Sequence, residues 1–150
     1  MDLSGAFISE IPVSDCSNVI SCKFLSDDQF SYLVMNTSGQ YVLQIMDMST
    51  QEVSQSAPIG DGSDYIYDYI CFENQWYFVS STQIDVYSAS FEKVGTILLG
   101  DYEAQAGPLT FYDDNGTLRI ALLSTAWPLV TIDTENLSLS EAGDVLDYTN

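Results

Sequence analysis

The feature that most constrains the fold is a regular alternation of short apolar runs with polar turns. Runs rich in β-branched and aromatic residues recur about every eight to twelve residues, and clusters of Asp, Asn, Ser and Gly separate them. Helical periodicity is almost absent. This pattern is typical of an all-β protein, and a chain of 150 residues with 46% hydrophobic content predicts a single domain, 1–150, around one substantial core.

The expected strands fall into three similar units, which we place at approximately 19–61, 62–101 and 102–145. In each unit an aromatic residue precedes an acidic or amide turn, as Phe24, Phe72 and Tyr112 do. Each unit ends in a Gly-Asp pair, at Gly60-Asp61, Gly100-Asp101 and Gly143-Asp144. The pairs recur at about 40 residues, which is the length of one four-stranded sheet in a radial repeat.

In strand order and turn placement, roughly residues 19–145 resemble the blades of a β-propeller of the broad WD-repeat or kelch-like kind. No Trp-Asp dipeptide, Gly-His pair or kelch double glycine is present, so the resemblance implies no subfamily. It implies an all-β fold of three four-stranded antiparallel blade-like sheets, arranged in a propeller-like manner. A β-sandwich or another meander of the same strands is the alternative.

Three blades are fewer than the four to eight that usually close a propeller, so we expect two apolar blade faces and a strand edge to need cover. Two chains could pair into a six-bladed ring, a partner could supply the missing wall, or the chain could be part of a longer propeller. The stretches AFISEIPV (6–13) and VLDY (145–148) are also long enough to add covering strands.

The net charge restricts the class of partner. Three basic residues, Lys23, Lys93 and Arg119, stand against 22 carboxylates, for a formal charge of −19. Phosphate neutralisation dominates nucleic-acid binding, so neither direct nucleic-acid binding nor docking on anionic membranes is expected. The electrostatic field of this negative charge favours association with a basic protein surface. The simpler alternative is that the charge only keeps the protein soluble.

No basic, apolar leader and no run of transmembrane length is visible, which predicts a cytoplasmic protein. Cys16, Cys22 and Cys71 make no even disulfide framework. We expect buried free thiols, with a Cys16–Cys22 bridge as the alternative.

Residues for common catalytic chemistry are missing. Without histidine the chain has neither a Ser-His-Asp triad nor a His-containing zinc site, and it has no C-x-x-C motif or phosphate-binding glycine loop. We therefore expect no enzyme and no cofactor. A glycoside hydrolase could still use a carboxylate pair, with candidates Asp61, Asp64, Asp101 and Asp144. Calcium is a further alternative at DGSD (61–64) and DDNG (113–116), although Asx turns explain both stretches.

In a propeller, loops between blades share one face with the loops that join second and third strands. That face would combine carboxylates with aromatic rings, a surface suited to lysines and arginines of a partner. The predicted partner-binding residues are Asp61, Asp64, Tyr65, Asp101, Tyr102, Glu103, Trp127 and Asp144. The opposite face would also be acidic, through Asp27, Asp28, Glu73, Asp113, Asp114, Asp133 and Glu135.

These observations predict a non-enzymatic, acidic protein-binding module. Its composition is that of inhibitors that cover a basic nucleic-acid-binding site, such as toxin immunity proteins, anti-defence proteins and nucleic-acid mimics. The alternative is a structural or scaffold half-propeller that self-assembles into a homo-oligomer or completes a larger ring.

The stretch IYDYICF (66–72) is predicted to be the innermost strand of the second unit. Strict alternation would place Ile66, Asp68 and Ile70 on one side and Tyr67 and Tyr69 on the other. Both sides should be covered, so the tyrosine rings should be buried with their hydroxyls on polar partners. Asp68 would then be a sheltered carboxylate, which requires water, a hydrogen-bond donor or a cation.

Overall fold

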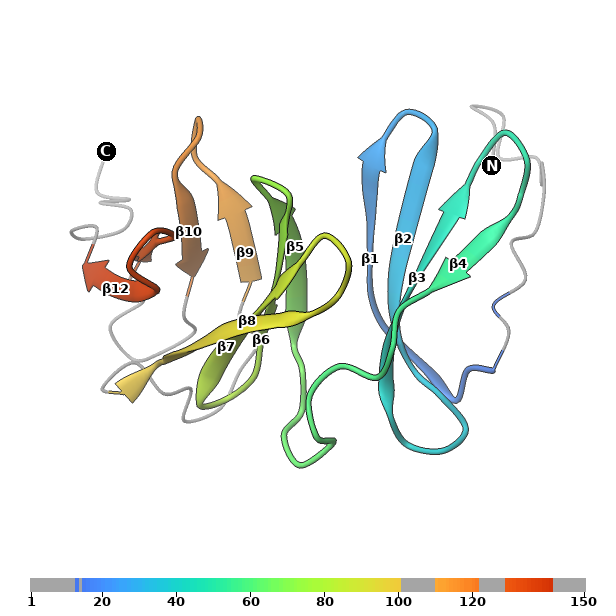
Figure 1. Ribbon diagram of the computed structural model, residues 1–150, viewed down its shortest axis with the longest axis horizontal. Coiled ribbons are helices and arrows are strands. Elements are labelled where there is room, and N and C mark those ends of the chain that lie inside the picture. Colours follow the sequence, from blue (N-terminus) through green and yellow to red (C-terminus); the bar gives the residue numbers. More distant parts are fainter. Residues whose placement is uncertain (1–12, 14, 101–109, 122–128, 142–150) are drawn as a thin grey trace, which may run out of the picture.

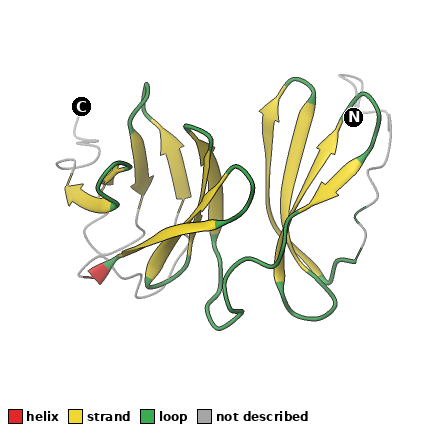
Figure 2. Cartoon of the chain, viewed as in Figure 1, coloured by secondary structure: helices red, strands yellow, loops and turns green. Residues whose placement is uncertain are grey.

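A computed structural model describes residue 13 and the ranges 15–100, 110–121 and 129–141 (Figure 1). Its regular secondary structure is almost entirely β-strand, with strands joined by turns and loops and one short helical segment that begins at Gly100 (Figure 2). The strands form three four-stranded sheets, and in each of them neighbours in the chain are antiparallel neighbours in the sheet. None of the sheets closes into a barrel. The predicted all-β fold of blade-like sheets is therefore confirmed.

The sheets follow one another along the chain. The first contains β1 (Asn18–Ser26), β2 (Gln29–Met35), β3 (Tyr41–Asp47) and β4 (Val53–Gln55). The second contains β5 (Asp68–Phe72), β6 (Gln75–Val79), β7 (Gln83–Ser88) and β8 (Lys93–Leu98). The third contains β9 (Thr110–Asp113), β10 (Leu118–Ala121), β11 (Leu129–Asp133) and β12 (Ser138–Glu141).

The acidic and amide turns form tight hairpins where the sequence predicts them. Phe72 pairs with Gln75, so Glu73 and Asn74 alone join β5 to β6. Their φ angles are 49° and 62°, the left-handed conformation that a two-residue type I′ turn needs at both positions. In Figure 1 this turn lies at the same end of the molecule as the β1–β2 and β9–β10 turns, while residues 56–67 lie at the opposite end.

The first strands of the three sheets lie side by side: β1 contacts β5, and β5 contacts β9. This arrangement places the second sheet in the middle (Figure 1). Its two faces contribute to two different cores. Tyr69, Trp76 and Phe78 pack with Leu33 and Leu43 of the first sheet.

The other face of the second sheet packs against the third sheet. Tyr77, Val79 and Ile84 lie in one cluster with Ile120 and Val130. Because both faces of the second sheet are covered, Trp76 to Val79 are all buried in succession. This explains why β6 is an unbroken apolar run rather than an alternating one.

The outward face of the third sheet is polar. Tyr112, Arg119, Thr131 and Ser140 are register neighbours across all four strands of that sheet. They alternate with the inward row that includes Ile120 and Val130, so they lie on the side away from the core. The expectation that both end faces would be apolar is therefore wrong for this row of the third sheet, where hydroxyl and guanidinium groups replace apolar side chains, whereas Ala121 and Leu129 in the next row of the same face are apolar.

The outward face of the first sheet is apolar and covered. Tyr32, Val34, Val42 and Met46 are at most 3% exposed and form a cluster of their own. Val13, Cys16 and Phe30 pack against this cluster. Val13 is the last residue of the stretch predicted to cover a blade face, and the rest of that stretch lies outside the described residues, as does VLDY.

All three cysteines are free, as expected, but Cys22 and Cys71 are exposed rather than buried. The burial prediction is wrong because exposed and sheltered residues alternate along β1, and Cys22 falls on the exposed side. Within the described residues, no helix is long and apolar enough to cross a membrane.

A glycine fixes the contact between β8 and the β11–β12 turn. A Cβ atom on Gly95 would lie 2.5 Å from Leu137 Cδ1. We expect Gly95→Val to destabilise the protein by about 1 kcal/mol, at the low end of overpacking costs because the end of the Leu137 side chain can move, and to lower the urea midpoint. Leu137→Ala in the same chain should recover part of this loss. If the two substitutions instead cost the sum of their separate effects, the residues are not coupled and the explanation fails.

Candidate functional site

Asp68 of β5 joins all three sheets. The residue is 5% exposed, and its Oδ1 accepts a hydrogen bond from Ser21 Oγ at 3.1 Å. Its Oδ2 lies 3.0 Å from Lys23 Nζ and also accepts from Thr110 Oγ1 and the backbone N–H of Phe111, both at 3.0 Å. The donors come from β1 and β9, so one carboxylate satisfies groups on both neighbouring sheets. The predicted need of Asp68 for a partner is met by a cation and three neutral donors.

The hydroxyl of Tyr69 extends this network toward the first sheet. It lies 2.7 Å from Ser31 Oγ, which also donates to the Lys23 carbonyl oxygen at 3.1 Å. Lys23 Nζ is 5.6 Å from the centre of the Tyr69 ring. Burial raises the pKa of Tyr69 far above its usual range. These groups bond to one another, so we assign this cluster a structural role.

Strict alternation along residues 66–72 is wrong in its first part. Ile66 packs in the core between the first and second sheets, together with Tyr69. Tyr67 and Ile70 pack in the core between the second and third sheets. The strand begins only at Asp68, so residues 66 and 67 lack the extended geometry on which a period of two depends.

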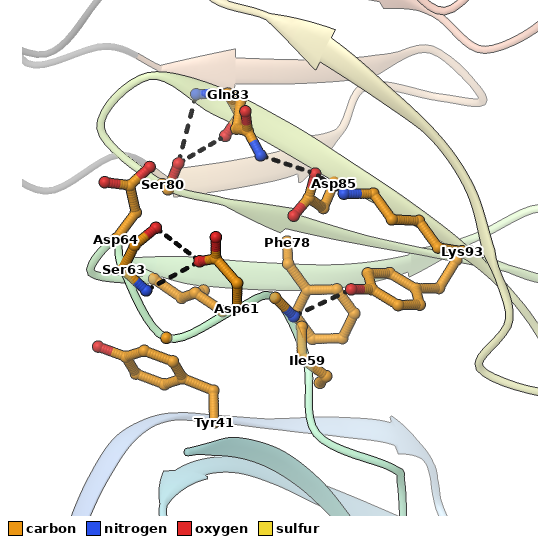
Figure 3. Close-up of a pocket in the computed structure, with 14 residues that line it drawn as sticks. Tyr41, Ile59, Asp61, Ser63, Asp64, Phe78, Ser80, Gln83, Asp85 and Lys93 are labelled. Carbon is orange, nitrogen blue, oxygen red and sulfur yellow. Dashed lines mark hydrogen bonds and ion pairs between the residues drawn. The ribbon is translucent and has the colours of Figure 1, made fainter. Parts of the chain in front are cut away.

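A pocket of about 310 Å³ lies between residues 59–66 and β6, β7 and β8 (Figure 3). Its lining includes the apolar side chains of Ile59, Ile66 and Phe78 and the rings of Tyr41 and Tyr87. Its polar lining consists of Asp61, Ser63, Asp64, Ser80, Gln83, Asp85 and Lys93. The pocket therefore joins the predicted contact loop to a polar stretch of the second sheet.

One side of the pocket contains an internally neutralised carboxylate. Asp85 Oδ1 lies 2.9 Å from Lys93 Nζ and accepts hydrogen bonds from Gln83 Nε2 and Thr96 Oγ1, each at 2.9 Å. The hydrogen bond to Asp85 raises the pKa of Lys93, so the ammonium stays charged. Asp85 and Lys93 thus compensate each other.

The loop on the other side holds two carboxylates that are less satisfied. Asp61 Oδ1 accepts hydrogen bonds from the backbone N–H of Ser63, at 2.9 Å, and from its hydroxyl. The Ser63 hydroxyl, and to a smaller extent the charge of Lys93, lowers the pKa of Asp61. Asp64 Oδ2 accepts from Thr82 Oγ1 at 3.2 Å. The remaining oxygen of each carboxylate accepts no hydrogen bond from another described residue.

The backbone holds this loop in place. Gly60 N–H donates to the Tyr87 hydroxyl at 3.0 Å, and Ile59 N–H donates to the Tyr41 carbonyl oxygen at 2.8 Å. The bonds from Ser63 make DGSD an Asx turn, and in DDNG the Gly116 N–H donates to Asp113 Oδ1 at 2.7 Å. The Asx-turn interpretation is confirmed for DGSD, whereas in DDNG the bond reaches three residues on, so the Asp113 side chain caps the turn without forming an Asx turn.

Three of the eight predicted partner-binding residues are described, and they lie close together. Asp61 and Asp64 line the pocket, whereas Tyr65 is 48% exposed next to it and packs edge-on against Tyr41. The other five, Asp101, Tyr102, Glu103, Trp127 and Asp144, lie outside the described residues.

The side of the pocket formed by the second sheet was not predicted from the sequence. Gln83 and Asp85 are two residues apart on β7 and line the same pocket. Two polar residues at this spacing in an otherwise apolar strand signal a partly polar face, and this could have been recognised. Lys93 could not have been found in this way, because its partner is known only once β7 pairs with β8.

The opposite end of the sheets carries a second set of carboxylates, and several are bonded locally. Asp133 accepts from the backbone N–H groups of Glu135 and Asn136. Asp114 Oδ2 forms an ion pair with Arg119 Nε at 2.9 Å. Asp27 and Asp28 are exposed in the β1–β2 turn. Acidity is thus present at both ends of the molecule, as the sequence predicts.

Among the described residues, no group of three or more His, Cys, Asp or Glu side chains is placed to hold a metal ion. Comparison of the chain with models of known protein families gave no match, and comparison with curated protein sequences gave none either.

Proposed function

We propose that this protein is a non-enzymatic, acidic binding module that docks on the basic surface of a partner protein. The proposal includes an inhibitory role, in which the module covers a site that otherwise binds nucleic acid, as immunity proteins, anti-defence proteins and nucleic-acid mimics do.

The observation that carries the proposal is that every basic side chain is used inside the fold. Lys23 pairs with Asp68 at 3.0 Å, Lys93 with Asp85 at 2.9 Å, and Arg119 with Asp114 at 2.9 Å. These are all the lysines and arginines of the chain, and subtracting these three from the 22 acidic residues leaves the formal net charge of −19.

The consequence is a surface that attracts cations and repels phosphates. Uncompensated carboxylates raise the rate of encounter with a basic protein, and they resemble the charge pattern that a nucleic-acid-binding site recognises. A protein that binds nucleic acid is therefore the class of partner with the best charge complementarity.

The carboxylate pair of a glycoside hydrolase is less well supported. Such an enzyme needs one carboxylic acid whose pKa is raised so that it can donate a proton. In the pocket, the pKa of Asp61 is lowered, and Asp85 is held in its ion pair with Lys93. Both features oppose that chemistry.

Self-assembly into a ring is also less well supported. Closure through the third sheet would bury the row Tyr112, Arg119, Thr131 and Ser140 against an apolar face of a neighbouring blade. Burying these polar groups without partners is unfavourable. The polar outward row of the third sheet therefore favours binding of a different protein over self-assembly into a ring.

We expect salt to weaken binding of the partner strongly. Proteins captured from cell extract at low ionic strength would be identified, purified and measured by stopped-flow and calorimetry. Between about 0.01 M and 0.15 M salt the Debye length falls from about 30 Å to about 8 Å, and the association rate constant should fall by about tenfold or more. A rate constant and affinity unchanged by salt would contradict the proposal, as would the absence of any partner with a Kd in the micromolar range or below.

A further inference from the structure

The pocket combines a small volume, negative charge and free acceptor oxygens at one place. At about 310 Å³ it lies at the lower end of the range of ligand pockets, so it suits one side chain better than an extended ligand. Tyr41, Phe78 and Tyr87 contribute rings to its lining, and Figure 3 shows Asp61 facing Gln83 and Asp85 across it.

The ion pair between Lys93 and Asp85 leaves the pocket with a net negative charge. Lys93 is held 2.9 Å from Asp85 Oδ1, so this pair adds no net charge. Asp61 and Asp64 bond through one oxygen each, to Ser63 and Thr82. Two negative charges therefore line the pocket, each with one oxygen to which no other described residue donates.

We propose that this pocket receives an arginine side chain of the basic partner. A guanidinium group is flat and has five donors, which suits a small pocket lined by two carboxylates. The backbone bonds from Gly60 to Tyr87 and from Ile59 to Tyr41 hold the loop in place, so little ordering is needed on binding. This inference rests on the proposed function, because it names the group that the partner would insert.

The first test uses N-acetyl-arginine amide as the probe and follows the backbone amide signals of the protein by NMR. We expect saturable shifts at residues 60–64 and at Gln83. N-acetyl-citrulline amide has nearly the same shape without the charge and should give no saturable shift. Equal binding of the citrulline compound would overturn the assignment of a cationic ligand, and a lack of saturable shifts with the arginine compound would overturn the pocket itself.

Matched variants separate this inference from the proposed function. Asp61→Asn with Asp64→Asn removes two charges at the pocket, and asparagine can keep the turn at residue 61. Asp27→Asn with Asp28→Asn removes two exposed charges at the other end of the sheets. The pocket variant should bind the arginine probe about tenfold more weakly, whereas the control variant should bind it like the wild type.

The same two variants are then compared with the purified partner. Greater weakening by the pocket variant supports arginine insertion. Equal, salt-dependent weakening by both variants would overturn the inference and leave the proposed function standing. Salt-independent binding of the partner, with the arginine probe still bound in the pocket, would instead contradict the proposed function alone.

Discussion

Replacing Asp68 with alanine should destabilise the protein by about 3–5 kcal/mol, because it removes one partner of a buried ion pair and leaves several donors unsatisfied. Ser21, Thr110 and the Phe111 N–H all donate to this carboxylate, and Lys23 pairs with it. For a domain whose total stability is of the order of 5–15 kcal/mol, this is a large loss. Urea unfolding followed by far-UV circular dichroism would measure it.

Asp85 provides a matched control for this substitution. It also pairs with a lysine and accepts from Gln83 and Thr96, but all of these partners lie on β7 and β8 of the same sheet. The Lys93 side chain is 46% exposed, so water can replace its lost partner. Asp85→Ala should therefore cost clearly less than Asp68→Ala. Equal losses of unfolding free energy for the two variants would show that the contacts of Asp68 between sheets contribute no more to stability than the contacts of Asp85 within one sheet.

The strands and turns were predictable because they depend on local sequence. The alternation of apolar runs with Asp, Asn and Gly turns predicts the hairpins of the first two sheets, and the two-residue turn at Glu73 and Asn74 lies where it is expected. The buried position of Asp68 also followed from its place in an apolar run. These features need information from only a few neighbouring residues.

The partners of Asp68 were not predictable, because they come from distant parts of the chain. Lys23 is 45 residues away and Phe111 is 43 residues away, and nothing local links either of them to position 68. The same reason hid the pairing of Lys93 with Asp85 in the pocket. The break in alternation at Ile66 and Tyr67 was missed because a strand boundary is set by pairing, which starts at Asp68.

The polar face of the third sheet was only partly predictable from the sequence. The alternation of Tyr112 with Phe111, and of Arg119 with Ile120, is visible in the sequence. Its meaning depends on which sheets lie beside it, because the same polar row in a middle sheet would be buried. A sequence pattern shows that two faces differ, but only the packing shows which face meets solvent.

Tyr69 and Tyr77 allow the two cores to be tested separately. Both side chains are fully buried, but Tyr69 packs toward the first sheet and Tyr77 toward the third. Truncation of either to alanine should cost about 3–5 kcal/mol through the loss of buried contacts. Tyr69→Phe should cost only about 1 kcal/mol, since it removes only the hydroxyl that bonds Ser31.

The location of the damage distinguishes the two alanine variants. Tyr69→Ala should speed amide hydrogen exchange in β2 and β3, whose Leu33 and Leu43 share its core. Tyr77→Ala should instead speed exchange in β10 and β11, through Ile120 and Val130. Because the second sheet contributes to both cores, its own strands should respond in both variants. The same pattern of exchange in both variants would mean that the three sheets unfold as one unit, with the two cores acting as a single cooperative structure.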